Sequence, residues 1–208
     1  MNTSETSLSV VIRERRSVRK YDPDFKISQE EILDILKEAA LAPSSSNLQP
    51  WKFIVIQDEA AKKELRAIAN NQEQVETSSA VIAVLADREM YRNGEKVYRS
   101  SFEAGYMDEA TMGRMIDNTN KLYPSIPLEM RENIASFDAG LVSMQLMLIA
   151  KARGYDTVPM GGFNRQQLID RFQIDERYMP VLLLSLGKAA VPGHKTTRIP
   201  IEELVEFI

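Results

Sequence analysis

Three arginines and a serine stand within a short run near the start of the chain: Arg15, Arg16, Ser17 and Arg19. Guanidinium groups at this spacing can hold a phosphate through paired hydrogen bonds, and a serine hydroxyl adds a further donor. The same run also fits a solvated basic face whose charge is balanced by neighbouring acidic residues. By itself, the run indicates an anion site without establishing one.

A second polar stretch contains Pro43, Ser44, Ser45 and Asn47 and lies between an expected helix and an expected strand. Its hydroxyl and amide groups could face the carbonyl and imide edges of a planar heterocycle. Because proline, serine and asparagine are also the ordinary residues of turns, the stretch is compatible with a plain connection as well.

Three further stretches have a functional and a plain interpretation. In Pro159, Met160, Gly161 and Gly162, the adjacent glycines let backbone N–H groups approach a ligand closely, or they simply form a turn. Residues 70–74, NNQEQ, are by themselves a polar loop. The cations that follow the last expected strand could be surface residues; they are Lys188, Lys195 and Arg198.

The composition leaves little chemistry to the side chains. The 208 residues include no cysteine and one histidine, His194, which excludes disulfides, thiolate nucleophiles and cysteine-based metal centres and argues against Ser–His triads. The formal charge of −4 argues against a nucleic-acid-binding protein, and the phosphate-loop, dinucleotide and nucleophile-elbow motifs are missing. The chemistry therefore comes from a borrowed cofactor, or the chain performs no catalysis.

Hydrophobic periodicity predicts helices interleaved with a few buried strands, which is typical of a mixed α/β or α+β layer fold. Ser28 and Glu31 have the spacing of a capping box, and Pro43 ends the helix that they begin. The expected helices are 7–14, 28–42, 58–69, 134–153 and 164–172, and the expected strands are 51–56, 80–86 and 179–187. Residues 157–164 are expected to form a junction, and residues 87–133 a mostly helical excursion over the core.

Two apolar segments need a covering surface. The expected helix 134–153 is apolar around most of its circumference, and the C-terminal tail ends in Ile201, Leu204, Val205 and Ile208. Both must be covered by the same chain or by a second subunit. The first residues lack the apolar run of a signal peptide, and no stretch suits a membrane span, so we expect a soluble cytoplasmic protein without a membrane or nucleic-acid partner.

The order of the polar stretches is more informative than any one of them. An RRSxR run, PSxxNxQPW after the second helix, P-x-G-G after the long apolar helix and Arg198 before P-I-E-E together resemble the FMN-dependent nitroreductase family, from Arg15 to Glu203. The segment Gly140–Leu148 is similar to the bacterial NAD(P)H nitroreductase-like subgroup. The resemblance implies an α+β, nitroreductase-like fold with a central, mostly antiparallel sheet flanked by helices, in an intertwined homodimer.

The resemblance also implies how FMN is held. The arginine run meets the phosphate, the ribityl chain and the pyrimidine edge, the serine-rich loop reaches a flavin bound mainly by the other subunit, and the twin glycines approach flavin N5. The implied cofactor-binding residues are Arg15, Arg16, Ser17, Arg19, Pro43, Ser44, Ser45, Asn47, Asn71, Gln74, Pro159, Met160, Gly161, Gly162, Lys188 and Arg198. Other members have a lysine at Gln74, and the family's K-x-R is here Thr196 and Arg198, so Lys188 or Lys195 could replace the missing lysine.

The implied organisation is one FMN-binding domain, residues 1–208. Residues 87–133 would roof the flavin, and residues 195–208 would form an arm that packs on the partner. Tyr98, Met112 and Tyr123 are among the candidate pocket linings, although such residues at helical spacing also form cores.

The implied function is an FMN-dependent NAD(P)H oxidoreductase. Hydride passes by a ping-pong cycle from NADH or NADPH through flavin N5 to a nitroaromatic or quinone-type acceptor, with no catalytic side chain and no metal. One alternative is a flavoenzyme of the same fold with another acceptor reaction: enone reduction, dehalogenation or flavin breakdown. A second is a non-enzymatic nucleotide-binding dimer.

Overall fold

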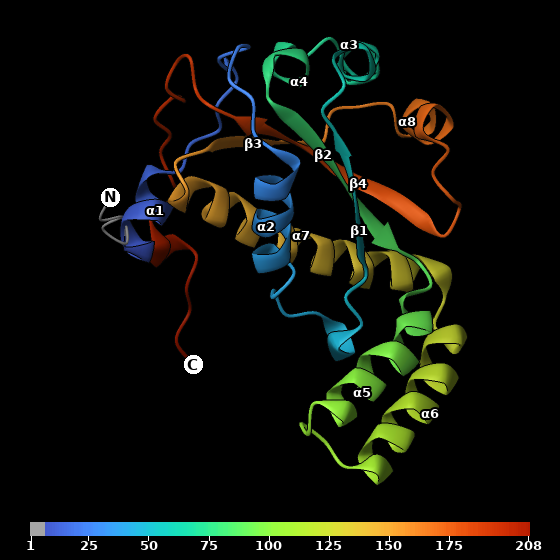
Figure 1. Ribbon diagram of the computed structural model, residues 1–208. Coiled ribbons are helices and arrows are strands. Elements are labelled where there is room, and N and C mark those ends of the chain that lie inside the picture. The colour runs from blue at the N-terminus through green and yellow to red at the C-terminus, as the bar shows by residue number, and fades with distance from the viewer. Residues whose placement is uncertain (1–6) are drawn as a thin grey trace.

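A four-stranded sheet lies at the centre of the computed structural model, which describes residues 7–208 (Figure 1). The strands follow one another across the sheet as β1 (Trp51–Ile56), β2 (Ala80–Asp87), β4 (Tyr178–Gly187) and β3 (Asp156–Met160), and every neighbouring pair is antiparallel. The expected α+β fold with a mostly antiparallel sheet is therefore confirmed. Residues 1–6, which the expected single domain includes, lie outside the described residues.

Helices cover both faces of the sheet. They are α1 (Leu8–Glu14), α2 (Gln29–Ala39), α3 (Glu59–Ile68), α4 (Glu73–Thr77), α5 (Gly94–Glu103), α6 (Glu109–Ser125), α7 (Leu128–Ala152) and α8 (Arg165–Phe172), with short 3₁₀ turns at Ser45–Asn47, Met90–Asn93 and Ile201–Glu203. Helix α2 begins as expected, because the Ser28 hydroxyl accepts the N–H of Glu31 at 3.1 Å.

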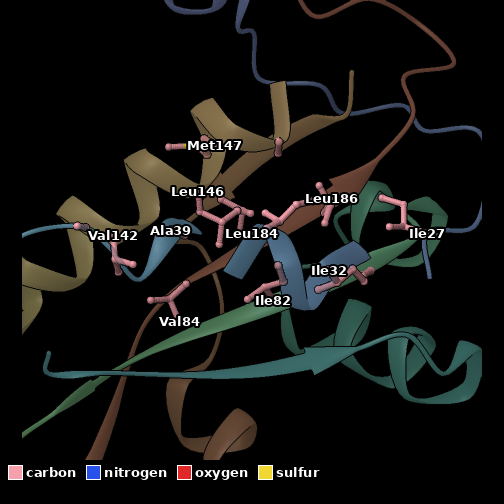
Figure 2. Close-up of a cluster of buried hydrophobic side chains, with 14 of the residues drawn as sticks. Ile27, Ile32, Ala39, Ile82, Val84, Val142, Leu146, Met147, Leu184 and Leu186 are labelled. Carbon is pink, nitrogen blue, oxygen red and sulfur yellow. The ribbon is translucent and has the colours of Figure 1, made fainter. Parts of the chain in front are cut away.

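The central strand β2 connects two cores, since its side chains alternate between the faces of the sheet. Ile82 and Val84 pack beneath α2 and α7, where Figure 2 shows them beside Leu146 and Leu184. Val81 packs on the opposite face with side chains of α3 and α8. A strand that is buried on both faces reads as a continuous apolar run, which is the pattern AVIAVLA that predicted it.

Three expected boundaries are wrong. Residues 157–164 were expected to be a junction only, but Asp156–Met160 form β3, and Pro159 fits there because β3 is an edge strand with β4 as its one partner. The polar segment 70–74 was expected to be a loop, but its second half starts the short helix α4. Helix α7 also begins at Leu128, earlier than residue 134, because Pro127 stands at its N-cap.

Helix α7 is the long core helix that the sequence predicted, and it is only partly covered. Ala139, Val142 and Leu146 are fully buried against the sheet, whereas Phe137 is 67% exposed and Met144 is 39% exposed. Within residues 7–208, α7 is the one helix that is long and apolar enough to cross a membrane by length and composition. Its contacts with α2, β2 and β3 are those of a core helix in a globular protein.

Helices α5 and α6 belong to a hairpin, residues 90–125, that projects from one end of the molecule (Figure 1). The hairpin shares a third core with the body of the molecule, in which Tyr98, Met112 and Tyr123 are buried together with Leu48 and Ala135. These three candidate pocket linings are therefore core residues in the single chain.

Candidate functional site

The arginine run lies against the end of the sheet where β3 begins. The amide N–H of Val18 donates to the carbonyl of Thr157 at 3.1 Å, Ser17 pairs with Thr157, and Tyr21 pairs with Ala189 just beyond β4. Val18 is 1% exposed, so its side chain anchors the run in the core while the polar side chains around it stay outside.

The C-terminal segment brings a further arginine, Arg198, to this run. An added Cβ at Gly193 would lie 2.6 Å from the Cβ of Arg16 and 2.9 Å from the carbonyl oxygen of Ser17, so the two segments touch at a position that only glycine allows. Burial, together with the positive charges of Arg198 and Arg16, lowers the pKa of Arg15. Arg16 and Arg198 are therefore close enough to the Arg15 guanidinium to repel it.

This cationic cluster, Arg15, Arg16 and Arg198, has no carboxylate partner among residues 7–208. The Arg16 guanidinium donates to the carbonyls of Arg13 and Arg15 at 2.6 and 2.8 Å, where it also meets the negative end of α1. An anion bound beside the three cations would relieve their mutual repulsion.

Of the C-terminal cations, Arg198 is the one that joins the cluster. The ammonium of Lys188 donates to the carbonyl of Gly154 at 3.2 Å, just beyond the end of α7. Arg19 is exposed, and its guanidinium reaches the carbonyl of Ser17 at 3.5 Å.

A wall of amide groups lies at the other end of β3. The Gln74 side chain is 5% exposed and donates to the sulfur of Met160 at 3.3 Å and to Oε1 of Gln72 at 2.9 Å. Gln72 in turn donates to the carbonyl of Gly162 at 2.9 Å. Nothing lies within 4 Å of a Cβ added to Gly161, so the backbone there faces open space.

Strand β3 fixes the spacing between the cluster and the wall. The arginine run pairs at Thr157, and the Gln74 amide meets Met160, three residues further on. At the rise of a β-strand, these contacts are separated by roughly 10 Å. Asn71, in the left-handed region with φ 56°, stands in the turn between α3 and Gln74.

The serine-rich loop, residues 43–49, is held elsewhere. The N–H of Ser45 donates to Asp138 of α7 at 2.9 Å and the Ser45 hydroxyl donates to the same carboxylate at 3.3 Å, while the Ser44 hydroxyl accepts the N–H of Gln49 at 2.9 Å. Burial raises the pKa of Asp138, and the two bonds from Ser45 partly offset that rise.

One chain therefore does not bring all the predicted site residues together. Asp138 holds the loop, whereas Gly154 follows the end of the same helix, three residues before Thr157, where the arginine run pairs. The rise of an α-helix places these two positions roughly 24 Å apart along α7. Pro43, Ser44, Ser45 and Asn47 form one half of the predicted site, and the residues around β3 form the other half.

Sequence reasoning missed several residues that build these two halves. Asp138 is the clearest, because a lone carboxylate between Ala135 and Ala139 on an apolar helix is a visible signal. Gly193 carries no such signal, because its role depends on a contact with a distant segment. Within residues 7–208, no group of three or more His, Cys, Asp or Glu side chains is placed to hold a metal ion.

The sheet, the cationic cluster and the amide wall define an α+β protein with a cationic site and a polar wall along its edge strand β3. Residues 12–188 match the model of the nitroreductase family. The chain belongs to this family.

Relatives and solved structures agree with this assignment. The chain is 46% identical over 199 residues to YdgI of Bacillus subtilis (strain 168), which is named as an NAD(P)H nitroreductase, with 95% of each chain covered. It is 43% identical to a nitroreductase of Exiguobacterium sibiricum 255-15 solved in complex with FMN, with a TM-score of 0.94 over 98% of each chain. It is also 30% identical over 210 residues to the CLA biosynthesis enone reductase of Lactiplantibacillus plantarum, covering 100% of this chain and 97% of the relative.

Proposed function

We propose that the chain is an NAD(P)H-dependent flavin oxidoreductase that binds FMN and reduces small, electron-poor acceptors. Family membership supports the oxidoreductase class. The observation that carries the proposal is the cationic cluster: Arg15, Arg16 and Arg198 converge without a carboxylate partner in the described part of the chain, about 10 Å along β3 from a wall of amides.

The residues present fit FMN. The cationic cluster suits its phosphate, and the Ser17 hydroxyl adds a donor. At the other end of β3, Asn71 and Gln74 offer polar amide groups to the polar edge of the ring, and the open backbone at Gly161 allows a close approach. Bound FMN supplies the redox chemistry, because its N5 accepts a hydride and gives it up again.

In this proposal the side chains orient FMN and stabilise its charge, and none is assigned a catalytic role. Arg15 and Arg198 would bind the phosphate, the backbone segment at Pro159 and Met160 would lie against one face of the ring, and polar groups at the pyrimidine edge would stabilise the negative charge that develops on reduction. The pyridine nucleotide and the acceptor take turns on the opposite face, as a ping-pong cycle requires.

The site is completed by a second copy of the chain, so the active species is a homodimer. The loop with Ser44 and Asn47 lies too far along α7 to reach the cationic cluster of its own chain. Exposed apolar side chains cover the surfaces that a dimer would bury, including Leu8 and Ile12 on α1 and Phe137 on α7. We assign the serine-rich loop to the flavin of the partner subunit.

The C-terminal arm, residues 195–208, contributes to this dimer. Its apolar side chains are exposed in the single chain; they are Ile199, Ile201, Leu204, Val205, Phe207 and Ile208. Along the unpaired edge of β1 runs an apolar groove of about 580 Å³, lined by Leu33, Ile54 and Phe172 among others. We assign the partner's arm to this groove, because the exposed apolar side chains of the arm would be buried against the apolar lining of the groove.

Purified protein tests the proposed function directly. We expect a yellow dimer that releases FMN on denaturation and bleaches anaerobically with NADH or NADPH, followed by reoxidation with a nitroaromatic or a quinone. A colourless protein that does not take up FMN from solution would overturn the proposal.

A second candidate keeps the flavin and changes the acceptor. The 30% identity to an enone reductase across the whole chain favours enone reduction as that alternative. Reoxidation of the reduced protein by an enone, faster than by any quinone or nitroaromatic, would identify it. A cytoplasmic location stays a prediction from the sequence.

A further inference from the structure

The backbone of the serine-rich loop adopts an unusual conformation. Ser46, Asn47 and Gln49 have φ values of 51°, 53° and 50°, in the left-handed region that favours glycine. Three such residues in a four-residue span are unfavourable for L-amino acids and persist only where the surroundings hold them. The loop therefore depends on bonds from outside itself.

The hairpin supplies those bonds. The Tyr98 hydroxyl donates to the carbonyl of Ser46 at 2.8 Å, and the Asn93 amide Nδ2 donates to the carbonyl of Leu48 at 2.9 Å. The hydroxyls of Tyr123 and Ser46 lie 3.0 Å apart. The two carbonyl bonds fall on either side of Asn47, so the hairpin fixes the backbone that carries this side chain.

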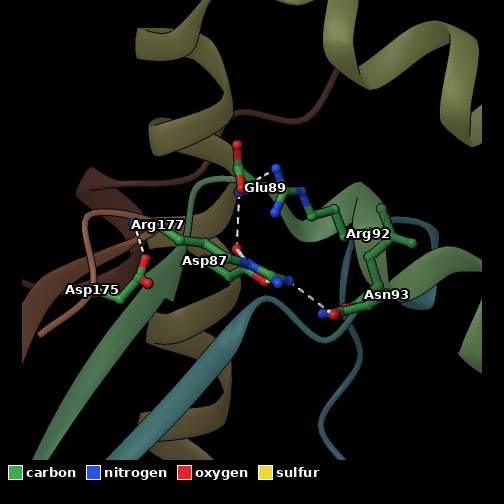
Figure 3. A network of polar contacts seen from close by, with 7 residues as sticks. Asp87, Glu89, Arg92, Asn93, Asp175 and Arg177 are labelled. Atoms are coloured by element: carbon green, nitrogen blue, oxygen red, sulfur yellow. Dashed lines mark hydrogen bonds and ion pairs between the residues drawn. The ribbon is translucent and has the colours of Figure 1, made fainter.

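An ion pair between Arg177 and the buried Asp87 orients Asn93. Arg177 donates to both oxygens of Asp87, at 2.7 and 2.5 Å, and Asp87 is 2% exposed. The same guanidinium donates to Oδ1 of Asn93 at 3.1 Å, as Figure 3 shows. Because only Oδ1 can accept, this contact turns the Nδ2 donor of Asn93 towards the carbonyl of Leu48.

We propose that Asn93 and Tyr98 are positioning residues of the flavin site, through which the hairpin of one subunit holds the loop that completes the partner's site. The inference rests on the proposed function, in which the loop meets the partner's flavin. A loop held in its binding conformation loses little freedom when FMN binds, so the hairpin raises affinity without touching the cofactor.

Reconstitution of the apoprotein with FMN tests the two residues. Asn93→Asp keeps the acceptor for Arg177 and removes the donor to Leu48, while Tyr98→Phe removes only the hydroxyl. We expect each variant to stay dimeric and to bind FMN about fivefold to fiftyfold more weakly, as for a buried carbonyl left unsatisfied. Asn118→Asp and Tyr106→Phe are matched controls at exposed positions of the hairpin. Both should bind FMN with the affinity of the parent protein.

Mixed dimers test the action across the subunits. One chain carries Arg15→Ala, and the other carries Asn93→Asp with Tyr98→Phe. If the hairpin serves the partner, one site of the mixed dimer combines an intact cationic cluster with an intact loop, so half of the sites bind FMN with the parent's affinity. If the hairpin serves its own chain, both sites are defective and no site of parental affinity appears.

The outcomes separate the inference from the proposed function. If the parent protein takes up no FMN, the proposed function fails. If the parent binds FMN while the Asn93 and Tyr98 variants bind it equally well, the positioning role is wrong. A mixed dimer without a site of parental affinity overturns the assignment to the partner.

Discussion

Single residues set the charge around the proposed flavin. Burial and the like charges of Arg198 and Arg16 lower the pKa of Arg15, and Gln74 presents a neutral amide where the resembling family often has a lysine. A neutral group stabilises a developing negative charge less than a cation does. We therefore predict an effect of Arg15 on the affinity for FMN and an effect of Gln74 on the reduction potential of the bound flavin.

Arg15→Ala should weaken FMN binding by about tenfold to a hundredfold, the effect of losing charge-assisted hydrogen bonds. The apoprotein should not lose thermal stability, because the change removes repulsion by Arg16 and Arg198. Fluorescence titration of FMN and a melting curve of the apoprotein measure the two effects. Arg13→Ala removes the same charge from an exposed position of α1 and serves as the control; equal losses in both variants would count against a specific phosphate contact.

Gln74→Lys should raise the two-electron reduction potential of the bound flavin by about 30–60 mV, the equivalent of one charge-assisted hydrogen bond. The reason is that an ammonium at the pyrimidine edge stabilises the reduced, anionic form. An anaerobic redox titration gives the potential. Gln74→Met, without a charge, should not raise it, and an unchanged potential in the lysine variant would remove Gln74 from the ring edge.

At the scale of elements, the loop between α2 and β1 is held by two helical units. Asp138 of α7 binds Ser45, and the hairpin binds the carbonyls on either side of Asn47. Left-handed backbone at Ser46 and Asn47 gives the loop no stability of its own. The conformation of the loop therefore depends on its hydrogen bonds to Asp138 and to the hairpin.

Asp138→Asn should show the cost of the buried charge as a pH dependence of stability. Burial raises the pKa of Asp138, so the folded parent loses stability as the pH rises from about 4, the ordinary pKa, through the higher folded value. The asparagine side chain does not ionise, so the variant does not lose stability in this way. Its amide can still bond the N–H and the hydroxyl of Ser45. Unfolding free energies at a series of pH values should thus show the variant gaining on the parent with rising pH until the difference levels off; a constant difference would contradict the raised pKa.

The whole molecule is arranged around one central sheet with an apolar surface left uncovered. Among residues 7–208, nothing covers Phe137 on α7 or the C-terminal arm, and the two halves of the predicted site lie roughly 24 Å apart along α7. A second copy of the chain would cover the exposed apolar side chains and would bring the two halves of the predicted site together. In the proposed function, the cofactor site is therefore complete only in the dimer.

Phe137→Glu should convert the dimer into monomers and abolish FMN binding, because a charge would be placed in the centre of the proposed interface. Size-exclusion chromatography with light scattering gives the mass, and absorbance gives the flavin content. Tyr106→Glu, in the turn of the hairpin and 84% exposed, is the control and should remain a yellow dimer. A dimeric, flavin-loaded Phe137→Glu protein would show that α7 does not form the interface.

The sequence by itself determined the elements and the chemical class. Apolar runs predicted β1, β2 and β4, and a periodic pattern predicted α2, α3 and α8, because burial imposes these periods locally. The order of the arginine run, the serine-rich loop and the twin glycines indicated the family that the comparisons confirm. Local signals suffice for such features, since each depends on neighbours in the chain.

Only the tertiary structure decided which residues meet. It made a strand of Asp156–Met160, because the segment pairs with β4 and an edge strand tolerates Pro159. It brought Arg198 to Arg15, left Lys188 at Gly154, and tied Asp138, Asn93 and Tyr98 to the serine-rich loop. These contacts join segments far apart in the chain, and no pattern within one segment contains the position of another.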